Sequence, residues 1–383
     1  MSARKQLRNP SVELMRIVGC LTVIGCHTTL PSYFDGGPVV ARVTLSCLFA
    51  DGVALFWFIT GFFMFREDYR YGKTLIRFIR KIALPTVVFL AFVWFFYDFI
   101  TGASGILESV GHSLRSYLKA LKKLLELKVP VSHCEHLWYV FAYLLLLLVG
   151  PALNSFALYL RESRRREDTF LVVSGCALIL NAVTLNETFV FSHHGLTALI
   201  PAATYALWGD ICYRRCVQRP PESRPKTVFV AIGVYAFSTA LRVWLQCLCY
   251  SRDAGQKMLF SWYTPFGIVT AVCATALCLG SIKDEGDRRV GSVICSLASY
   301  TFPIYLVHNL FIELLEAHGI LSALRGRIVP VVSGLGSLTY MLVVILVVFA
   351  LSLLTCVLLR ALVHAASRQI TEQQRQALHQ PTP

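Results

Sequence analysis

Long apolar segments separated by short polar loops follow one another along the whole chain. A helix needs about 20 apolar residues to cross a bilayer, and repeated runs of that length are typical of polytopic membrane proteins. The pattern therefore predicts an all-α transmembrane bundle of about ten helices. We place these helices at residues 12–31, 43–65, 82–101, 136–160, 169–187, 195–213, 227–250, 260–282, 291–316 and 331–360.

The composition agrees with a membrane protein. Hydrophobic residues make up 56% of the chain and charged residues 15%, with a mean hydropathy of +0.60. The first apolar segment is long, carries Arg16 near its start and lacks a small-residue cleavage pattern, so we do not interpret it as a secretory signal peptide. We expect residues 1–363 to form a single transmembrane domain and residues 364–383 a short polar cytoplasmic tail.

The net charge of +14 is concentrated in alternate loops. By the positive-inside rule such loops lie in the cytoplasm, and an even number of spans then places both termini there. We find no nucleic-acid motif and expect no nucleic-acid partner. The basic loops are the N-terminus, 66–81, 161–166, 214–226, 283–289 and the C-terminal tail.

The third loop, residues 102–135, is basic although it belongs to the opposite set of loops. Leucines recur there at helical spacing, from Leu114 to Leu125. This spacing predicts an amphipathic helix over residues 112–128, lying on the outer surface or covering a cavity.

The cysteines and histidines do not form a metal-binding pattern. The chain has 13 cysteines without a Cys-x-x-Cys pair, and most lie in apolar runs, where they are small buried hydrophobes. His133 and His136 have a spacing that could bind metal, but no third ligand with suitable spacing is visible. We therefore expect neither a metal site nor a disulfide framework.

Arg16 and His27 lie within the first apolar segment with ten residues between them. Eleven steps of about 100° make three turns plus roughly 20°, so both side chains share one face of a helix, roughly 16 Å apart. A membrane-embedded arginine costs roughly 2.5–3.5 kcal/mol and usually faces a bundle interior. The alternative is that Arg16 reaches the headgroups and His27 is a satisfied polar residue near the other interface.

Other charged residues flank the cytoplasmic ends of the predicted spans. Glu13 precedes Arg16 by three residues and is close enough for an ion pair on one helix. Arg77 and Arg80 share a helical face just before the third span, where two guanidiniums suit a phosphate-bearing ligand. The alternative for Arg77 and Arg80 is ordinary positive-inside flanking.

Two charges lie close to or within predicted spans. Asp51 stands in the second predicted span directly before the run Gly52–Phe58, and we interpret it as a helix-start residue. Arg242 is an intramembrane charge whose partner the sequence does not identify.

Histidines also occur at the ends of later spans. His136 opens the fourth span, followed closely by Trp138. His308 closes the motif that contains Tyr305 in the ninth span. These residues are candidates for a polar site, although aromatic belts and helix-end histidines at an interface produce the same pattern.

Several motifs occur in a defined order along nearly the whole chain. The first is the stretch of residues 9–16, whose Arg16 is followed by ten residues and then His27. The others are, in order, Phe56–Phe63, Arg77-x-x-Arg80, His136-Leu137-Trp138-Tyr139 with Pro151 downstream, and Ile304-Tyr305-Leu306-Val307-His308. This ordered set resembles the acyltransferase-3 family of integral membrane acyltransferases. The chain carries Thr60 where the family's Phe-Phe-x-x-Ser-Gly signature usually has serine.

The resemblance implies a fold of ten or so transmembrane helices. It also implies transfer of an acyl group, commonly acetyl from acetyl-CoA as co-substrate, to a hydroxyl of exopolysaccharide, O-antigen, capsule or another glycan of the cell envelope. The chain resembles the branch without a fused esterase-like domain. Its beginning is most similar to bacterial cell-surface sugar O-acetyltransferases, which implies the bacterial inner (plasma) membrane, contact with membrane lipid, and a surface polysaccharide or lipid-linked sugar as acceptor.

This family activity gives the predicted site residues their expected roles. Arg16, Arg77 and Arg80 would hold the phosphate-bearing end of coenzyme A, and His27 would act as general base or carry the acetyl group covalently. Glu13 would support Arg16. The acceptor or the thioester carbonyl would be positioned by the remaining candidates, His136, Trp138, Tyr305 and His308.

A transporter or flippase for a lipid-linked sugar or polysaccharide is the alternative function, with Arg16 and His27 lining the route. Internal repeats would favour transport, and we find none. We also find no His-x4-Asp box, nucleophile elbow or P-loop, which disfavours soluble-type acyl transfer and ATP-driven transport.

Overall fold

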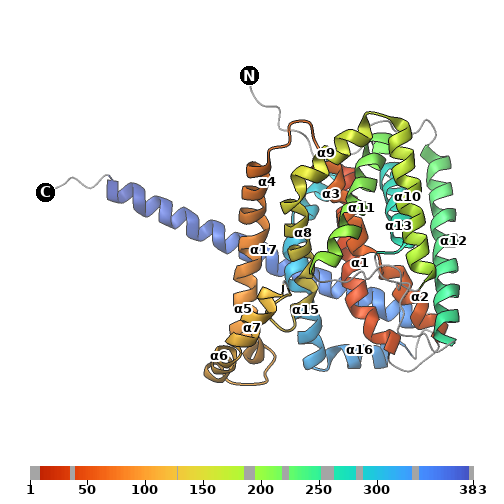
Figure 1. The fold of residues 1–383 in the computed structure, drawn as a ribbon. Helices are drawn as coiled ribbons and strands as arrows, with labels where there is room; N and C mark the ends of the chain where they lie inside the picture. The colour runs from red at the N-terminus through yellow and green to blue at the C-terminus, as the bar shows by residue number, and fades with distance from the viewer. Residues whose placement is uncertain are drawn as a thin grey trace.

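The computed structural model describes residues 9–34, 39–126, 128–184, 195–217, 224–251, 263–281, 288–329 and 336–378. These residues form helices and connecting turns, and no strand occurs among them. The predicted all-α class is therefore confirmed. Figure 1 shows most helices side by side in one bundle, with the C-terminal helix projecting beyond it.

The helices follow one another with short connections. The α-helices are α1 (Pro10–Phe34), α2 (Val39–Phe49), α3 (Gly52–Met64), α4 (Tyr71–Phe78), α5 (Leu84–Ile100), α6 (Ile106–Arg115), α7 (Tyr117–Leu125), α8 (Trp138–Leu148), α9 (Gly150–Arg161), α10 (Arg164–Val183), α11 (Leu199–Cys212), α12 (Arg224–Ser251), α13 (Pro265–Ser281), α14 (Arg288–Ala298), α15 (Thr301–Ala317), α16 (Ile320–Ile328) and α17 (Gly336–Leu378). Two π-helical segments, η1 (Ile79–Ala83) and η4 (Tyr213–Val217), and two 3-10 segments, η2 (Glu135–Leu137) and η3 (Gly195–Ala198), adjoin them.

The described residues contain 5 helices long and apolar enough to cross a membrane, or up to 7 if each of two bent pairs is one span. Residues Glu135–Leu148 and Gly150–Arg161 bend by 68°, with Pro151 at the start of the second helix. Proline lacks the amide hydrogen that would continue the helix, which explains a break there. The expected count of ten spans stays a prediction.

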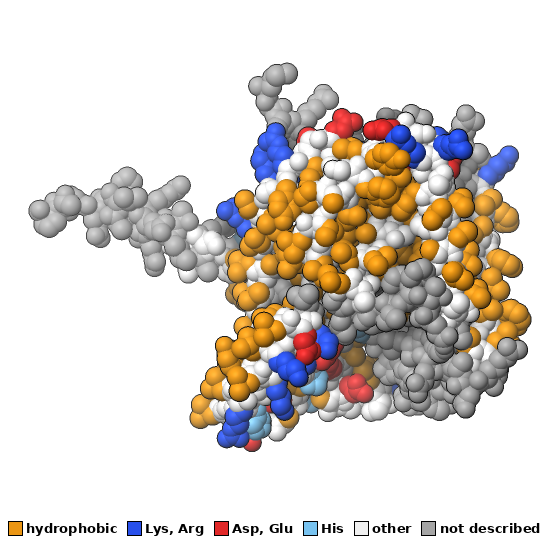
Figure 2. Space-filling view, in the orientation of Figure 1, with side chains coloured by type: hydrophobic (Ala, Val, Ile, Leu, Met, Phe, Trp, Pro, Cys, Tyr) orange, Lys and Arg blue, Asp and Glu red, His pale blue; other side chains and the backbone are white. Residues whose placement is uncertain are grey.

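The surface has the distribution expected of a membrane protein. Figure 2 shows hydrophobic side chains over the middle of one face, with charged side chains gathered toward its upper and lower ends. On α12, for example, Phe229 and Phe237 are 79% and 70% exposed. In a membrane, large apolar side chains exposed along such a helix contact lipid and not water. Together with the spans, they indicate a multi-pass membrane protein.

Helix α1 lies inside the bundle. It packs against α2, α3, α13, α14, α15 and α17 (Figure 1). The start of α3 meets α1 closely, because a Cβ atom on Gly52 would lie 2.7 Å from the backbone nitrogen of Val23. The first apolar segment therefore faces protein along much of its circumference.

Helices α3 and α11 cross in close contact. A Cβ atom on Gly61 would overlap the carbonyl oxygen of Ala206, and one on Gly209 would overlap the carbonyl oxygen of Phe58. Small residues at a crossing let membrane helices approach until their backbones touch. Gly61 belongs to the motif over residues 56–63, so close helix packing explains the glycine in that motif.

Arg242 of α12 finds its partner in Asp51, just before α3. Its Nη1 and Nη2 atoms lie 2.8 and 3.0 Å from the two carboxylate oxygens of Asp51, and both side chains are buried. Thr270 donates a further hydrogen bond to Asp51 at 2.7 Å. Asp51 is the residue at which α3 starts, as the sequence predicted, but its side chain binds Arg242 and Thr270 and makes no cap hydrogen bond.

The basic loop at residues 66–81 and the predicted amphipathic segment lie at opposite ends of α5 (Figure 1). The amphipathic segment forms two helices, α6 and α7, that meet at Ser116.

Helix α17 crosses the bundle and continues to Leu378, so most of the predicted tail is helical. Arg4, Lys5 and Arg8, on which the N-terminal topology depends, lie outside the described residues, and the cytoplasmic location of the termini stays a prediction.

Candidate active site

Helix α1 presents Arg16 and His27 at two levels of the bundle. The helix is unbroken from Pro10 to Phe34, so the two residues share one face and stand roughly 16 Å apart along the axis. Arg16 Nη1 lies 3.0 Å from Oε1 of the buried Glu13, and its guanidinium lies 5.4 Å from the ring centre of Phe63. Both hydrogen bonds to Glu13 use Nη1, so within the described residues the other guanidinium nitrogens of Arg16 are available to a ligand.

A basic cavity with a volume of about 510 Å³ opens beside Arg16. Its walls come from α1, α3, α4, η1, α8 and the connection between α3 and α4. Six cationic side chains line it together with one carboxylate, Asp68, so the cavity favours an anionic ligand. The cationic residues are Arg16, Arg66, Arg70, Lys73, Arg77 and Lys81.

Tyr69 adds a hydroxyl to the wall of this cavity. Its Oη atom is buried and has no hydrogen-bond partner in the described part of the chain. Burial, with a smaller contribution from Tyr71, raises the pKa of Tyr69, so the hydroxyl keeps its proton. An unpartnered buried donor beside six cations fits a ligand with phosphate oxygens.

The structure separates the two arginines of the Arg77-x-x-Arg80 motif. Both side chains are exposed, but Arg77, in the last turn of α4, lines the cavity, whereas Arg80 does not contribute to the lining. Arg80 belongs to the π-helical segment η1, whose wider turn changes the angular spacing expected for an α-helix. The expectation of a shared face depended on that α-helical spacing.

His27, His136 and His308 form a cluster of three imidazoles. The ring centre of His27 lies 5.9 Å from that of His136 and 5.2 Å from that of His308, and the last two are 5.0 Å apart. They come from α1, η2 and α15, which are distant in sequence. His136 and His308 are buried, while His27 is partly buried.

Backbone carbonyls determine which nitrogen carries hydrogen in two of these rings. Nε2 of His136 lies 3.2 Å from the oxygen of Leu306, and Nδ1 of His308 lies 2.8 Å from the oxygen of Tyr305. A carbonyl oxygen only accepts, so both nitrogens are donors. Nδ1 of His136 and Nε2 of His308 are buried without a partner among the described residues, and each can accept a hydrogen bond.

Tyrosines connect the imidazole cluster with the basic cavity. The Tyr305 hydroxyl donates to the carbonyl oxygen of His136, and its ring centre lies 5.9 Å from that of His308. Tyr139 lines the cavity, and its ring centre lies 6.1 Å from that of Tyr305. Trp138 packs edge-on against Tyr139 at 6.3 Å, so it contacts this connection from the side.

A family model described as an acyltransferase domain, Acyl_transf_3, matches residues 9–359. The chain belongs to the acyltransferase-3 family. No curated protein and no solved structure matches it. The match covers Arg16 and Arg77 of the cavity and all three histidines of the cluster, and it makes the protein a membrane acyltransferase.

The imidazole cluster of this acyltransferase does not have the geometry of a metal site. Within the described residues, no three His, Cys, Asp or Glu side chains are arranged to hold a metal ion. His133 does not join the cluster but points to Glu313, with Nδ1 3.1 Å from Oε2.

Sequence reasoning missed a second polar network beside the cluster. Glu313 accepts hydrogen bonds from Tyr97 at 2.5 Å and from Asn309 at 2.8 Å. Asn309 also donates to the carbonyl oxygen of His133, whose ring stacks on Tyr97 with centres 4.0 Å apart. Glu313, five residues after His308, could have indicated this network from the sequence, because Glu is rare inside an apolar span.

An ion-pair network supports the rim of the basic cavity. Arg161 of α9 binds the carboxylate of Asp210 and donates to the carbonyl oxygen of Phe65 at 2.9 Å. Asn154 holds the next residue, Arg66, through two backbone hydrogen bonds of 2.8 and 3.1 Å. These contacts fix the chain where it leaves α3 and enters the cavity wall.

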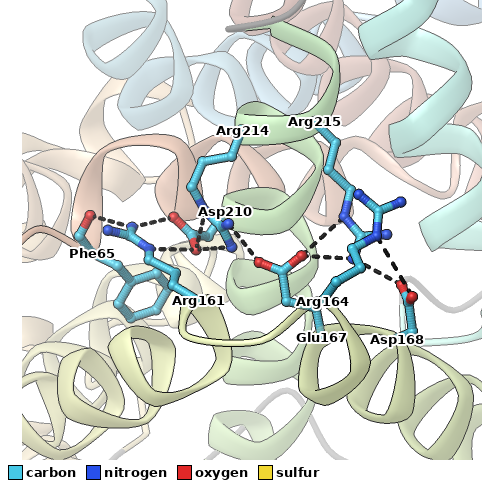
Figure 3. Close-up of polar contacts among 8 residues, drawn as sticks. All are labelled: Phe65, Arg161, Arg164, Glu167, Asp168, Asp210, Arg214 and Arg215. Carbon is cyan, nitrogen blue, oxygen red and sulfur yellow. Dashed lines mark hydrogen bonds and ion pairs between the residues drawn. The ribbon is translucent and has the colours of Figure 1, made fainter.

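Figure 3 shows how this network extends across α10 and α11 of the acyltransferase. Arg214 lies between Asp210 and Glu167, and Arg215 between Glu167 and Asp168. The hydrogen bond from Arg215 lowers the pKa of Asp168. Sequence reasoning assigned these arginines to positive-inside flanking, but each is paired within the protein and fixes the helix ends.

Proposed function

We propose that this membrane acyltransferase moves an acetyl group from acetyl-CoA to a hydroxyl of a cell-surface glycan or its lipid-linked precursor, in the bacterial inner membrane. The family match supports acyl transfer at a membrane. The identity of donor and acceptor and the general-base role of His27 belong to the proposal.

The basic cavity supports a coenzyme A donor. The nucleotide end of coenzyme A carries phosphates, and forked guanidiniums such as those of Arg16 and Arg77 bind phosphate oxygens by paired hydrogen bonds. Tyr69 supplies a protonated hydroxyl for a further hydrogen bond. Aromatic side chains in the same wall, among them Phe63 and Tyr139, offer apolar surface to the rest of the donor.

The distance between Arg16 and His27 supports a long donor rather than a catalytic pair. Roughly 16 Å of helix separates the two residues, which is too far for one to orient the other. A ligand that is anionic at one end and reactive at the other can contact both. Tyr139 and Tyr305 mark a continuous line of side chains from the cavity to the histidines.

The chemistry at the cluster requires one proton acceptor. His27 takes the proton from the acceptor hydroxyl as its oxygen attacks the thioester carbonyl. The new C–O bond forms, the C–S bond breaks, and the thiolate of coenzyme A leaves and receives a proton. A histidine has a reference pKa suited to such a general base, which typically contributes about 10²- to 10⁴-fold to a rate.

His136 and His308 serve this step as hydrogen-bond acceptors. Their backbone-bound N–H groups hold each ring in one tautomer, and their second nitrogens point into a buried region. An acceptor nitrogen near His27 can orient its ring or hold the attacking hydroxyl. In the covalent variant of the reaction, His27 itself attacks the thioester and then passes the acetyl group to the hydroxyl.

One observation carries this proposal: the same helix brings Arg16 to a basic cavity and His27 to two further imidazoles. The test is incubation of membranes containing the protein with acetyl-CoA labelled in the acetyl group, followed by identification of the labelled product. We expect label in a glycan or lipid-linked sugar, and none with the His27→Ala variant. Unlabelled glycan, together with movement of a lipid-linked sugar across the membrane, would replace the proposal with transport.

A further inference from the structure

Helix α7 separates two adjoining cavities and presents a different face to each. Tyr117, Leu121 and Leu124 line an apolar cavity. Lys119 and Lys123 line a polar one. The spacing within each set places its members on one side of the helix. The amphipathic pattern of this segment therefore matches two distinct environments.

The apolar cavity has a volume of about 570 Å³ and lies between α5, α7 and α8. Nearly all of its lining is hydrocarbon or aromatic, from residues such as Leu90, Phe141 and Leu144. Val87 at its edge is 60% exposed on the apolar surface of α5. A cavity with this lining, reached from the lipid-facing surface, is suited to a hydrocarbon chain.

The polar cavity has a volume of about 320 Å³ and carries an excess of basic groups. Its one carboxylate, Asp98, lies 3.6 Å from His112. Among the residues that the structure describes, Lys119 and Lys123 have no acidic partner, whereas Lys122 and Lys128 both contact Glu126. The two lysines that face the cavity are thus available to an anion. Figure 2 shows Lys, Arg, His and acidic side chains beside hydrophobic ones over the region of α6 and α7.

The two cavities adjoin each other and share part of their walls. Trp94, Ala120, Pro130 and Val131 line both of them. An apolar cavity and a basic cavity placed side by side match the two parts of a ligand that has a hydrocarbon chain and an anionic group. Two ammonium groups next to an apolar groove are complementary to a lipid whose phosphate directly follows its chain.

The polar cavity is linked to the imidazole cluster through Asn309. Tyr97 and His133 line its wall as a stacked pair, and the carbonyl oxygen of His133 accepts a hydrogen bond from Asn309. Asn309 directly follows His308 in α15. A sugar attached to a phosphate held by Lys119 and Lys123 would lie against this wall.

We propose that the two cavities bind the acceptor as a glycolipid in which a phosphate joins the sugar to a hydrocarbon chain. The chain lies between α5, α7 and α8, and Lys119 and Lys123 hold the phosphate. This inference rests on the proposed function, since it names the form in which the glycan hydroxyl reaches the histidines. It assigns to α6 and α7 the role of a binding element for the carrier lipid.

The test is binding of tritium-labelled farnesyl phosphate to the purified protein in phosphatidylcholine nanodiscs, without acetyl-CoA. We expect saturable binding that unlabelled farnesyl phosphate displaces and that farnesol, phosphatidylglycerol and glucose 1-phosphate displace at least tenfold less well. Farnesol lacks the phosphate, glucose 1-phosphate lacks the chain, and phosphatidylglycerol represents bulk anionic lipid. Equal displacement by farnesol or by phosphatidylglycerol would overturn the inference.

Variants locate the binding. Lys119→Ala combined with Lys123→Ala should weaken binding at least tenfold, because two charge-assisted contacts are lost. Lys122→Ala, which removes a lysine from the same helix but outside the cavity, should have no effect. Ala91→Trp should fill the groove and also weaken binding at least tenfold, whereas Val88→Trp on the lipid-facing surface of α5 should not. Equal effects of either variant and its control would overturn the assignment.

The binding assay separates this inference from the proposed function. Farnesyl phosphate binding at Lys119 and Lys123 with no acetyl transfer to any acceptor would retain the lipid site and contradict the enzyme. Acetyl transfer to a soluble glycan without farnesyl phosphate binding would retain the enzyme and overturn the lipid site. Melting temperatures of all variants show whether a loss of binding reflects unfolding.

Discussion

His136 and His308 place their ring centres 5.0 Å apart, and each donates one N–H to a backbone carbonyl of α15. The two residues come from opposite halves of the chain and meet beside His27 of α1. Their remaining nitrogens are acceptors in a buried region. The arrangement brings His27 together with two oriented imidazoles, on which the proposed proton abstraction depends.

Replacement of His27 by alanine should remove the general base. We expect kcat to fall by about 10²- to 10⁴-fold, with unchanged affinity for coenzyme A in calorimetry, because the proposed phosphate-binding residues Arg16 and Arg77 line a different part of the bundle. His318→Ala, in the turn after α15, is a control that should keep full activity. Turnover of the His27→Ala variant within a few-fold of the unaltered protein would remove His27 from the reaction.

Arg77 and Arg80 should differ in their effect on donor binding. Arg77 lines the basic cavity and Arg80 does not. Loss of one charge-assisted contact to phosphate costs about 1.5–3 kcal/mol, so Arg77→Ala should weaken coenzyme A binding by roughly tenfold to a hundredfold. Arg80→Ala is the matched control and should bind nearly normally. Equal losses from both substitutions would contradict a donor site in this cavity.

Gly61 should not tolerate a side chain. A Cβ atom there would overlap the carbonyl oxygen of Ala206 at the crossing of α3 and α11. Forcing these helices apart should lower stability by about 1–3 kcal/mol, measurable as a lower melting temperature in detergent. Gly233→Ala in α12 is the control, since nothing lies within 4 Å of its Cβ position. That variant should be unchanged or slightly more stable, by up to about 1 kcal/mol.

Substitution of Arg242 or Asp51 alone should destabilise the protein more than substitution of both together. Removing one member of a buried ion pair leaves an uncompensated charge and typically costs about 3–5 kcal/mol. Arg242→Leu or Asp51→Leu alone should therefore lower expression and melting temperature strongly. The double variant should recover much of the loss, because two apolar side chains replace two charges. Additive losses in the double variant would show that the pair is not the cause.

Local pattern was sufficient for the coarse features of this protein. Apolar runs predicted helices because each backbone polar group must find its partner within a membrane helix. The helical period placed Arg16 and His27 on one face, and α1 is unbroken between them. The ordered motifs indicated the acyltransferase-3 family, which the match over residues 9–359 confirms. These inferences need only spacing along one segment.

Contacts between distant segments were decided by the tertiary structure. The meeting of His136 and His308, the pairing of Arg242 with Asp51, and the network around Glu313 depend on which helices are neighbours. Helix neighbours are set by packing of many side chains, such as Gly61 against α11, and that information is not local. The π-helical turn at Arg80 likewise changed a spacing that the sequence alone predicts as α-helical. The sequence by itself thus determined the all-helical class, the family and a set of candidate residues, because these need only local spacing; only three-dimensional packing decided which of those residues meet.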